Sequence, residues 1–261
     1  MAAPDETLAP SAPRGVSPVA IGLLLVFLAL GASLVVVEAP PRILTFLFVV
    51  AGWVLALIAH EFGHAYIAWK AGDHTVATKG YLTLDPLKYA DLGASLVIPL
   101  VALALGGIGF PGGAVYLRED LMRSRLWRSA ASLAGPAGTL VTFVLLALAV
   151  RLALGWAGLD GLALVSGLSF LAFLQATALI LNLLPVPGLD GYGVIRPFLP
   201  KAVRVRLRRW EGLAMIVLFA ALFLIPGGAA ALVQAAIALT VAAGVPHEAV
   251  VAGLDAFRFW S

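Results

Sequence analysis

Long runs of apolar residues, separated by short polar turns, dominate the pattern of this chain. Four runs cover 19–37, 43–69, 129–154 and 162–184, and two shorter ones cover 213–225 and 229–245. A helix needs about 20 apolar residues to cross the ~30 Å hydrocarbon core of a bilayer. The pattern therefore predicts an all-α polytopic membrane protein with about six transmembrane helices.

A seventh apolar run, 94–110, is short and ends in a glycine-rich stretch. If this run crosses the membrane, 5 of the Lys and Arg residues lie on one side of the bilayer and 12 on the other. If it enters and returns to the same side, 15 lie on one side, and only Arg42 and Arg151 lie on the other. Basic residues gather on the cytoplasmic side of membrane proteins. We therefore expect a re-entrant or partial segment here.

Composition supports a membrane location, since 62% of the residues are hydrophobic and 12% charged, against about 25% charged in soluble domains. The spans leave little chain for a second domain. We expect a disordered, proline-containing tail over 1–17 and a membrane-embedded domain over 18–245. We expect an interfacial tail over 246–261, where Val250, Leu254, Phe257 and Trp260 recur at near-helical spacing.

Charge and cysteine content narrow the candidate chemistry. The net charge is +3, but the basic residues lie in loops where they set membrane topology, so we expect no nucleic-acid partner. Cysteine is absent, which excludes disulfides and thiolate metal ligands. His, Asp and Glu remain as metal ligands.

The second apolar run contains His60-Glu61-Phe62-Gly63-His64 in its last third. On a helix, residues four apart share a face, so both imidazoles can bind one metal ion while Glu61 serves as general base. Interfacial hydrogen bonding is the alternative for such residues. Ionisable groups at membrane depth are costly, however, and the motif predicts a single Zn²⁺ per chain.

A hydrolytic zinc site usually has a third protein ligand. Besides Glu61, Asp190 is the carboxylate that follows a long apolar span, in Asn182-Leu-Leu-Pro185-Val-Pro-Gly-Leu-Asp190-Gly. Proline and glycine there can end the helix and turn the carboxylate inward. The alternative is a solvated turn with Asp190 as a helix cap.

Together, HEFGH and Asn-x-x-Pro-x-Pro-x-Leu-Asp-Gly resemble the motifs of the site-2 protease family of intramembrane zinc metalloproteases. Two further segments also resemble parts of the family: Ser-Leu-Ala-Gly-Pro-Ala-Gly at 132–138 and the loop at 84–91. The resemblance therefore covers about 43–210. The loop departs from the family where Tyr89-Ala-Asp-Leu stands for a His-Ile-Asp-Pro type sequence.

The resemblance implies regulated proteolysis, in which a zinc site cleaves a transmembrane protein or peptide substrate in or near its membrane segment. His60, His64 and Asp190 match the zinc ligands, Glu61 the general base, and Asn182 a residue that positions substrate or stabilises an oxyanion. We expect a bacterial plasma membrane protein whose site opens toward the cytoplasm. A metal sensor or transporter without proteolysis, and a structural scaffold, are the alternatives.

For three smaller features, the sequence leaves two alternative roles open. Asn182 can instead form a helix–helix hydrogen bond. The segment 76–84 forms either a short β-hairpin that pairs with substrate or a surface loop. Gly135 and Gly138 favour close helix packing over chemistry.

Overall fold

The computed structural model describes residues 15–89, 101, 103, 109, 115–156 and 162–260. Every regular element in this part of the chain is helical, which confirms the predicted all-α class. The helices, with η for 3₁₀ turns, are α1 (Pro18–Val36), α2 (Arg42–Ala71), α3 (Thr75–Thr78), η1 (Tyr81–Thr83), η2 (Pro86–Lys88), η4 (Glu119–Leu121), α5 (Arg125–Trp156), α6 (Leu162–Asn182), α7 (Asp190–Ile195), η5 (Arg196–Phe198), α8 (Lys201–Arg208), α9 (Glu211–Phe223), α10 (Ala230–Ala242) and α11 (His247–Phe257).

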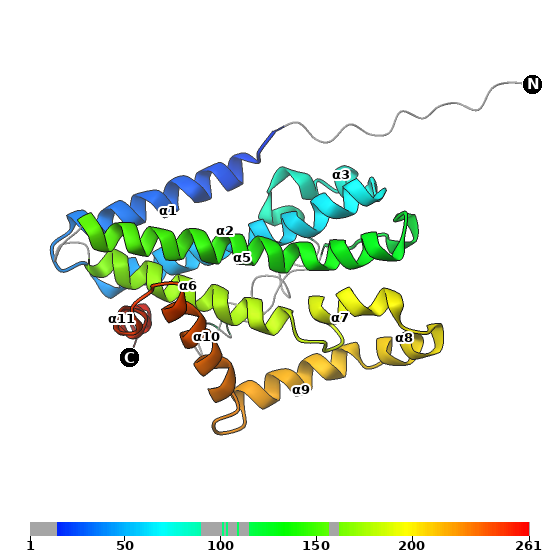
Figure 1. Cartoon of the computed structure of the whole chain (residues 1–261). Coiled ribbons are helices and arrows are strands. Elements are labelled where there is room, and N and C mark those ends of the chain that lie inside the picture. Colours follow the sequence, from blue (N-terminus) through cyan, green and yellow to red (C-terminus); the bar gives the residue numbers. More distant parts are fainter. Residues whose placement is uncertain are drawn as a thin grey trace, which may run out of the picture.

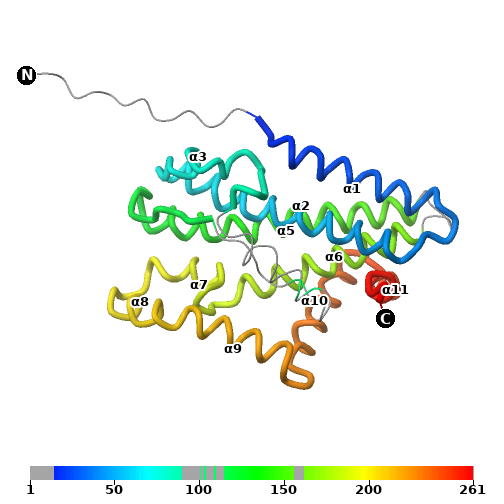
Figure 2. Tube along the Cα trace, turned by 180° about the vertical axis from the view of Figure 1, so that it is seen from behind, coloured from blue at the N-terminus to red at the C-terminus, as the bar shows by residue number. Residues whose placement is uncertain are grey.

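Four helices, α1, α2, α5 and α6, are long and apolar enough to cross a membrane. They lie side by side and run in alternating directions along the chain (Figure 1). At 13 residues each, α9 and α10 extend about 20 Å, less than the bilayer core. These two shorter helices form a V beside the bundle (Figures 1 and 2). Length and composition thus support four spans in the described chain, against about six predicted.

The stretch between α2 and α5 leaves and returns at one end of the bundle. The Arg123 backbone N–H donates to the carbonyl of Ala71, the last residue of α2, at 3.0 Å. The predicted re-entrant segment 94–110 lies almost wholly outside the described residues. Of its members, Leu103 is buried in the main core, and Gly109 donates its N–H to Thr177 Oγ1 at 2.9 Å.

The segment 76–84 is not a hairpin, so that alternative is wrong. It contains the end of α3 and the turn η1, and its backbone hydrogen bonds are local, such as Lys79 N–H to the Thr75 carbonyl at 3.0 Å. Both Gly80 and Leu84 have positive φ, at 77° and 59°. These left-handed residues break the extended backbone that paired strands require.

The centre of the bundle is α6, which packs against α5, α2, α10 and α11. The C-terminal helix α11 buries one face, where the ring centroids of Phe257 and Phe170 of α6 lie 5.3 Å apart. At the same end, Arg42 and Asp255 form an ion pair at 2.8 Å. The segment 247–257 is thus helical and docked on the bundle, while the placement of the tail at the membrane surface stays a prediction.

Candidate metal centre

Two histidines of α2 face the same side of that helix, one turn apart. Both His60 and His64 are buried, and their Nε2 atoms lie 3.1 Å apart. The i, i+4 spacing predicted this convergence, and the fold supplies the rest by burying this face against α5.

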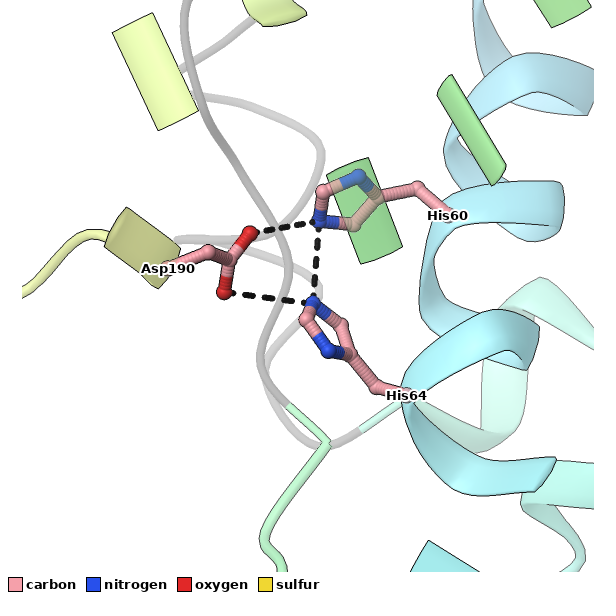
Figure 3. Close-up of side chains that lie close together, drawn as sticks. All are labelled: His60, His64 and Asp190. Carbon is pink, nitrogen blue, oxygen red and sulfur yellow. Dashed lines mark hydrogen bonds and ion pairs between the residues drawn. The ribbon is translucent and has the colours of Figure 1, made fainter. Parts of the chain in front are cut away.

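Asp190 reaches the histidines from the first turn of α7. Its Oδ2 lies 3.2 Å from His60 Nε2, and its Oδ1 lies 3.2 Å from His64 Nε2 (Figure 3). The carboxylate therefore bridges both imidazoles. It does not cap its helix, because the N-cap is Leu189 and no side-chain cap bond forms there.

The turn between α6 and α7 depends on two glycines. Gly188 has a φ of 100°, a left-handed conformation that favours glycine. At Gly191 a Cβ would lie 2.3 Å from the Leu183 carbonyl oxygen, so only glycine lets α7 return against the end of α6. This local backbone aims Asp190 at the histidines.

The hydrogen bonds behind the imidazoles suit metal binding. His64 Nδ1 lies 2.8 Å from the Ala131 carbonyl oxygen, which can only accept, so Nδ1 carries the proton and the Nε2 of the neutral ring has a free lone pair. His60 Nδ1 lies 2.8 Å from Thr139 Oγ1, which can accept in the same way. Such partners are typical of histidines that ligate zinc through Nε2.

The donor set fits a zinc ion. One ligand atom each from His60, His64 and Asp190 lies within 4.8 Å of the others, and these three residues form a group that could hold a metal ion. Asp190 Oδ2 is buried and has no hydrogen-bond partner among the described residues, which leaves it available as a ligand. Two imidazoles and one carboxylate are a common catalytic zinc set.

The charges around Asp190 favour its ionised form. In the metal-free site both imidazoles can be protonated on Nε2. Burial raises the pKa of the Asp190 carboxyl, but the positive charges of the protonated imidazoles outweigh burial and lower the pKa below its usual range. Asp190 is thus held as a carboxylate, the form that binds a cation.

The small-residue motif of α5 lies directly against the metal-binding turn of α2. A Cβ at Gly135 would lie 2.1 Å from His64 Nε2, and one at Gly63 would lie 2.3 Å from the Ala134 carbonyl oxygen. At Gly138 it would lie 2.7 Å from the Ala59 carbonyl oxygen. The predicted role of Gly135 and Gly138 in close packing is confirmed, and Gly135 also borders the site itself.

Glu61 lies beside the three residues and is only 2% exposed. Its Oε2 accepts a hydrogen bond from the backbone N–H of Val115 at 3.2 Å. Val115 lies in the irregular stretch 115–118, which leads into η4. The chain therefore places one carboxylate, Asp190, among the candidate ligands and a second, Glu61, next to them.

Asn182 is buried as the last residue of α6. Within the described residues, no hydrogen bond joins its amide to His60, His64 or Asp190, so its role stays a prediction. Sequence reasoning did not find the partners Thr139 and Val115. Thr139 carried one signal, since it lies one helical turn after Gly135.

Comparison with known proteins identifies the family. A protein of Mycolicibacterium smegmatis named "Putative zinc metalloprotease Rip2" is 53% identical over 178 residues, which cover 66% of each chain. The Mycobacterium tuberculosis protein of that name is 44% identical over 222 residues, 83% of this chain and 82% of the relative. "Putative zinc metalloprotease YwhC" of Bacillus subtilis is 32% identical over 185 residues, 69% of this chain and 82% of the relative.

No family model and no solved structure matches the chain. The relatives nevertheless agree with both the motifs and the geometry, because each is named as a zinc metalloprotease and the chain brings a zinc-type ligand set together among membrane-spanning helices. The chain is a zinc metalloprotease and belongs to the site-2 protease family of intramembrane metalloproteases.

Proposed function

We propose that this enzyme hydrolyses a peptide bond in or near a transmembrane segment of another membrane protein, as a step of regulated intramembrane proteolysis. In this proposal His60, His64 and Asp190 hold the zinc ion and Glu61 is the general base. The observation that carries it is the convergence of the three ligand atoms within 4.8 Å, with a buried carboxylate beside them.

Zinc, when bound, polarises a carbonyl group and makes water a nucleophile at neutral pH. The protein residues have complementary tasks. Glu61 takes a proton from the attacking water and passes it to the leaving amine. Asn182 donates to the developing oxyanion or positions the substrate strand.

The site lies near one end of the bundle, and we place that end at the cytoplasmic face of a bacterial plasma membrane. The basic residues at the ends of the long helices support this orientation, because Lys70 lies in the last turn of α2 and Arg125 begins α5 at this end. Arg42 and Arg151 lie at the opposite end, where α2 begins and α5 approaches its C-terminus. Water can reach a site close to the membrane surface.

The orientation can be measured without background labelling, because the natural chain has no cysteine. Lys201→Cys places a thiol on exposed α8, at the end of the molecule where α2 finishes and α5 begins (Figure 1), and Glu38→Cys places one on the exposed turn between α1 and α2. We expect a membrane-impermeant maleimide to label Glu38→Cys in intact cells and Lys201→Cys only after lysis. The reverse pattern would place the site on the outer face.

Activity is tested by zinc content and by cleavage of a peptide with one transmembrane segment, flanked by a fluorophore and a quencher, in proteoliposomes. We expect near-stoichiometric zinc in wild type and Glu61→Gln, with cleavage by wild type alone. Glu248→Gln, an exposed carboxylate of α11, is the matched control and should cleave normally. Zinc without cleavage of any tested transmembrane peptide would favour the non-proteolytic sensor or transporter.

A further inference from the structure

Asp73 is a buried carboxylate outside the metal centre, just beyond the end of α2, and its side chain is 0% exposed. Its Oδ1 accepts hydrogen bonds from the Thr75 backbone N–H at 3.1 Å and from Thr75 Oγ1 at 2.5 Å. Its Oδ2 accepts from the backbone N–H of Arg118 at 2.7 Å. One oxygen thus stabilises a local turn, while the other reaches across 45 residues of sequence.

Arg118 lies three residues after Val115 in the same stretch. Two carboxylates therefore hold this stretch, since Glu61 accepts from the Val115 N–H and Asp73 accepts from the Arg118 N–H. Both acceptors belong to α2 or to the turn directly after it. The stretch follows the last turns of α2 and spans from Glu61 to the end of that helix.

Other contacts also hold this region, since Val115 and Leu117 pack against the apolar cluster that contains Tyr81. Lys79 Nζ donates to the Tyr116 carbonyl oxygen at 2.8 Å, but on the exposed surface. Arg123 binds the carbonyl groups at the end of α2, beyond η4. Asp73 is the buried anchor of 115–118 on the side away from Glu61.

We propose that Asp73 is a positioning residue for Glu61. By fixing Arg118 it keeps the Val115 N–H on Glu61 Oε2, so the carboxylate cannot turn freely and Oε1 is left to take the proton. Rotation about the last side-chain torsion of glutamate is soft, so one fixed hydrogen bond decides where its oxygens lie. The inference rests on the proposed role of Glu61 as general base.

The substitution Asp73→Asn tests this contact selectively. The amide oxygen can still accept from Thr75, while the amide NH₂ faces the Arg118 N–H as a second donor and cannot bind it. Thr75→Val is the control for the local turn, because it removes one bond to Oδ1 and leaves Oδ2 intact. Asp85→Asn is the matched control, since Asp85 accepts from the Leu87 N–H in a similar turn without touching 115–118.

We expect Asp73→Asn to lower kcat about tenfold to a hundredfold, as for small displacements of a reacting group. Zinc content and KM should stay within about twofold of wild type, since the ligands and the substrate contacts are unchanged. Hydrogen exchange of the peptide containing Val115 and Arg118 should become faster. Thr75→Val and Asp85→Asn should keep the kcat of wild type.

Three results would overturn the inference: faster exchange at 115–118 with unchanged kcat, an equal loss of kcat in Asp85→Asn, or unchanged exchange in Asp73→Asn. The exchange measurement needs no substrate, so it tests the contact between Asp73 and Arg118 even if wild type cleaves no peptide. A wild type without cleavage would refute the proposed function instead. Should Asp73→Asn fail to fold, Lys79→Met loosens the same stretch from its exposed side. Faster exchange in Lys79→Met must then be accompanied by lower kcat.

Discussion

Gly135 of α5 lies directly against His64 of α2, so close that a Cβ at position 135 would come within 2.1 Å of the His64 Nε2 atom. The same Cβ would lie 2.7 Å from His60 Nε2. The absence of a side chain at position 135 therefore leaves the space in front of both histidine nitrogens open.

Gly135→Ala should abolish zinc binding, because the added methyl group occupies the space in front of both nitrogen atoms. Metal content measured by mass spectrometry on the purified protein checks this. Gly155→Ala, near the end of the same helix, has no atom within 4 Å of its Cβ and should keep its zinc. Full zinc in Gly135→Ala would mean that the two helices can separate at little cost.

Thr139→Val should weaken zinc binding by about 10–100-fold, the usual effect of losing the partner of a ligating histidine. Valine has nearly the same shape but offers no acceptor to His60 Nδ1, which then lies buried without its partner at 2.8 Å. Competition with a fluorescent chelator measures the affinity. Thr139→Ser keeps the hydroxyl group and should restore most of it.

Zinc should raise the thermal stability of the metal-free protein. A ligand present at 100 times its Kd stabilises the folded state by about 2.7 kcal/mol. In Asp190→Asn the carboxylate that lies 3.2 Å from both imidazoles is lost, so the zinc-dependent rise in Tm should largely disappear. An equal rise in this variant would remove Asp190 from the ligand set.

Phe257→Ala should destabilise the protein by about 3–5 kcal/mol, as expected for a large aromatic side chain removed from a core. Phe257 is 1% exposed and packs on both Phe46 and Phe170. Trp260→Ala, at a half-exposed position of the same tail, should cost much less. Thermal unfolding in detergent compares the two, and zinc content should be normal in both because α11 docks at the opposite end of α2 from the site.

The parts of the fold and site that depend on local periodicity could be predicted from sequence. The helical period brings His60 and His64 together, and the apolar runs gave the long helices nearly to their ends. Asp190 could be found because few carboxylates follow a membrane span. The hairpin at 76–84 failed because Gly80 and Leu84 adopt left-handed backbone that weak alternation does not reveal.

The contacts that could not be predicted join residues far apart in sequence. Thr139 lies 79 residues from His60, Val115 lies 54 from Glu61, and Arg118 lies 45 from Asp73. In two of these pairs the donor is a backbone N–H, which has no residue type to recognise. Only the packing of α5 and the stretch 115–118 on α2 makes these partners available.

Because α6 lies at the centre of the bundle, its side chains are surrounded mainly by protein and not by lipid. In the most apolar 18 residues of α6, 83% are buried inside the protein, against 17% in α1. The mean hydropathy of these segments is 2.8 in α1 and 2.0 in α6. The buried Ser169, Gln175 and Thr177 of α6 therefore face neighbouring helices instead of lipid tails. Contact with lipid therefore constrains the sequence of α1, whereas α6, which is surrounded by protein, can carry polar side chains within its length.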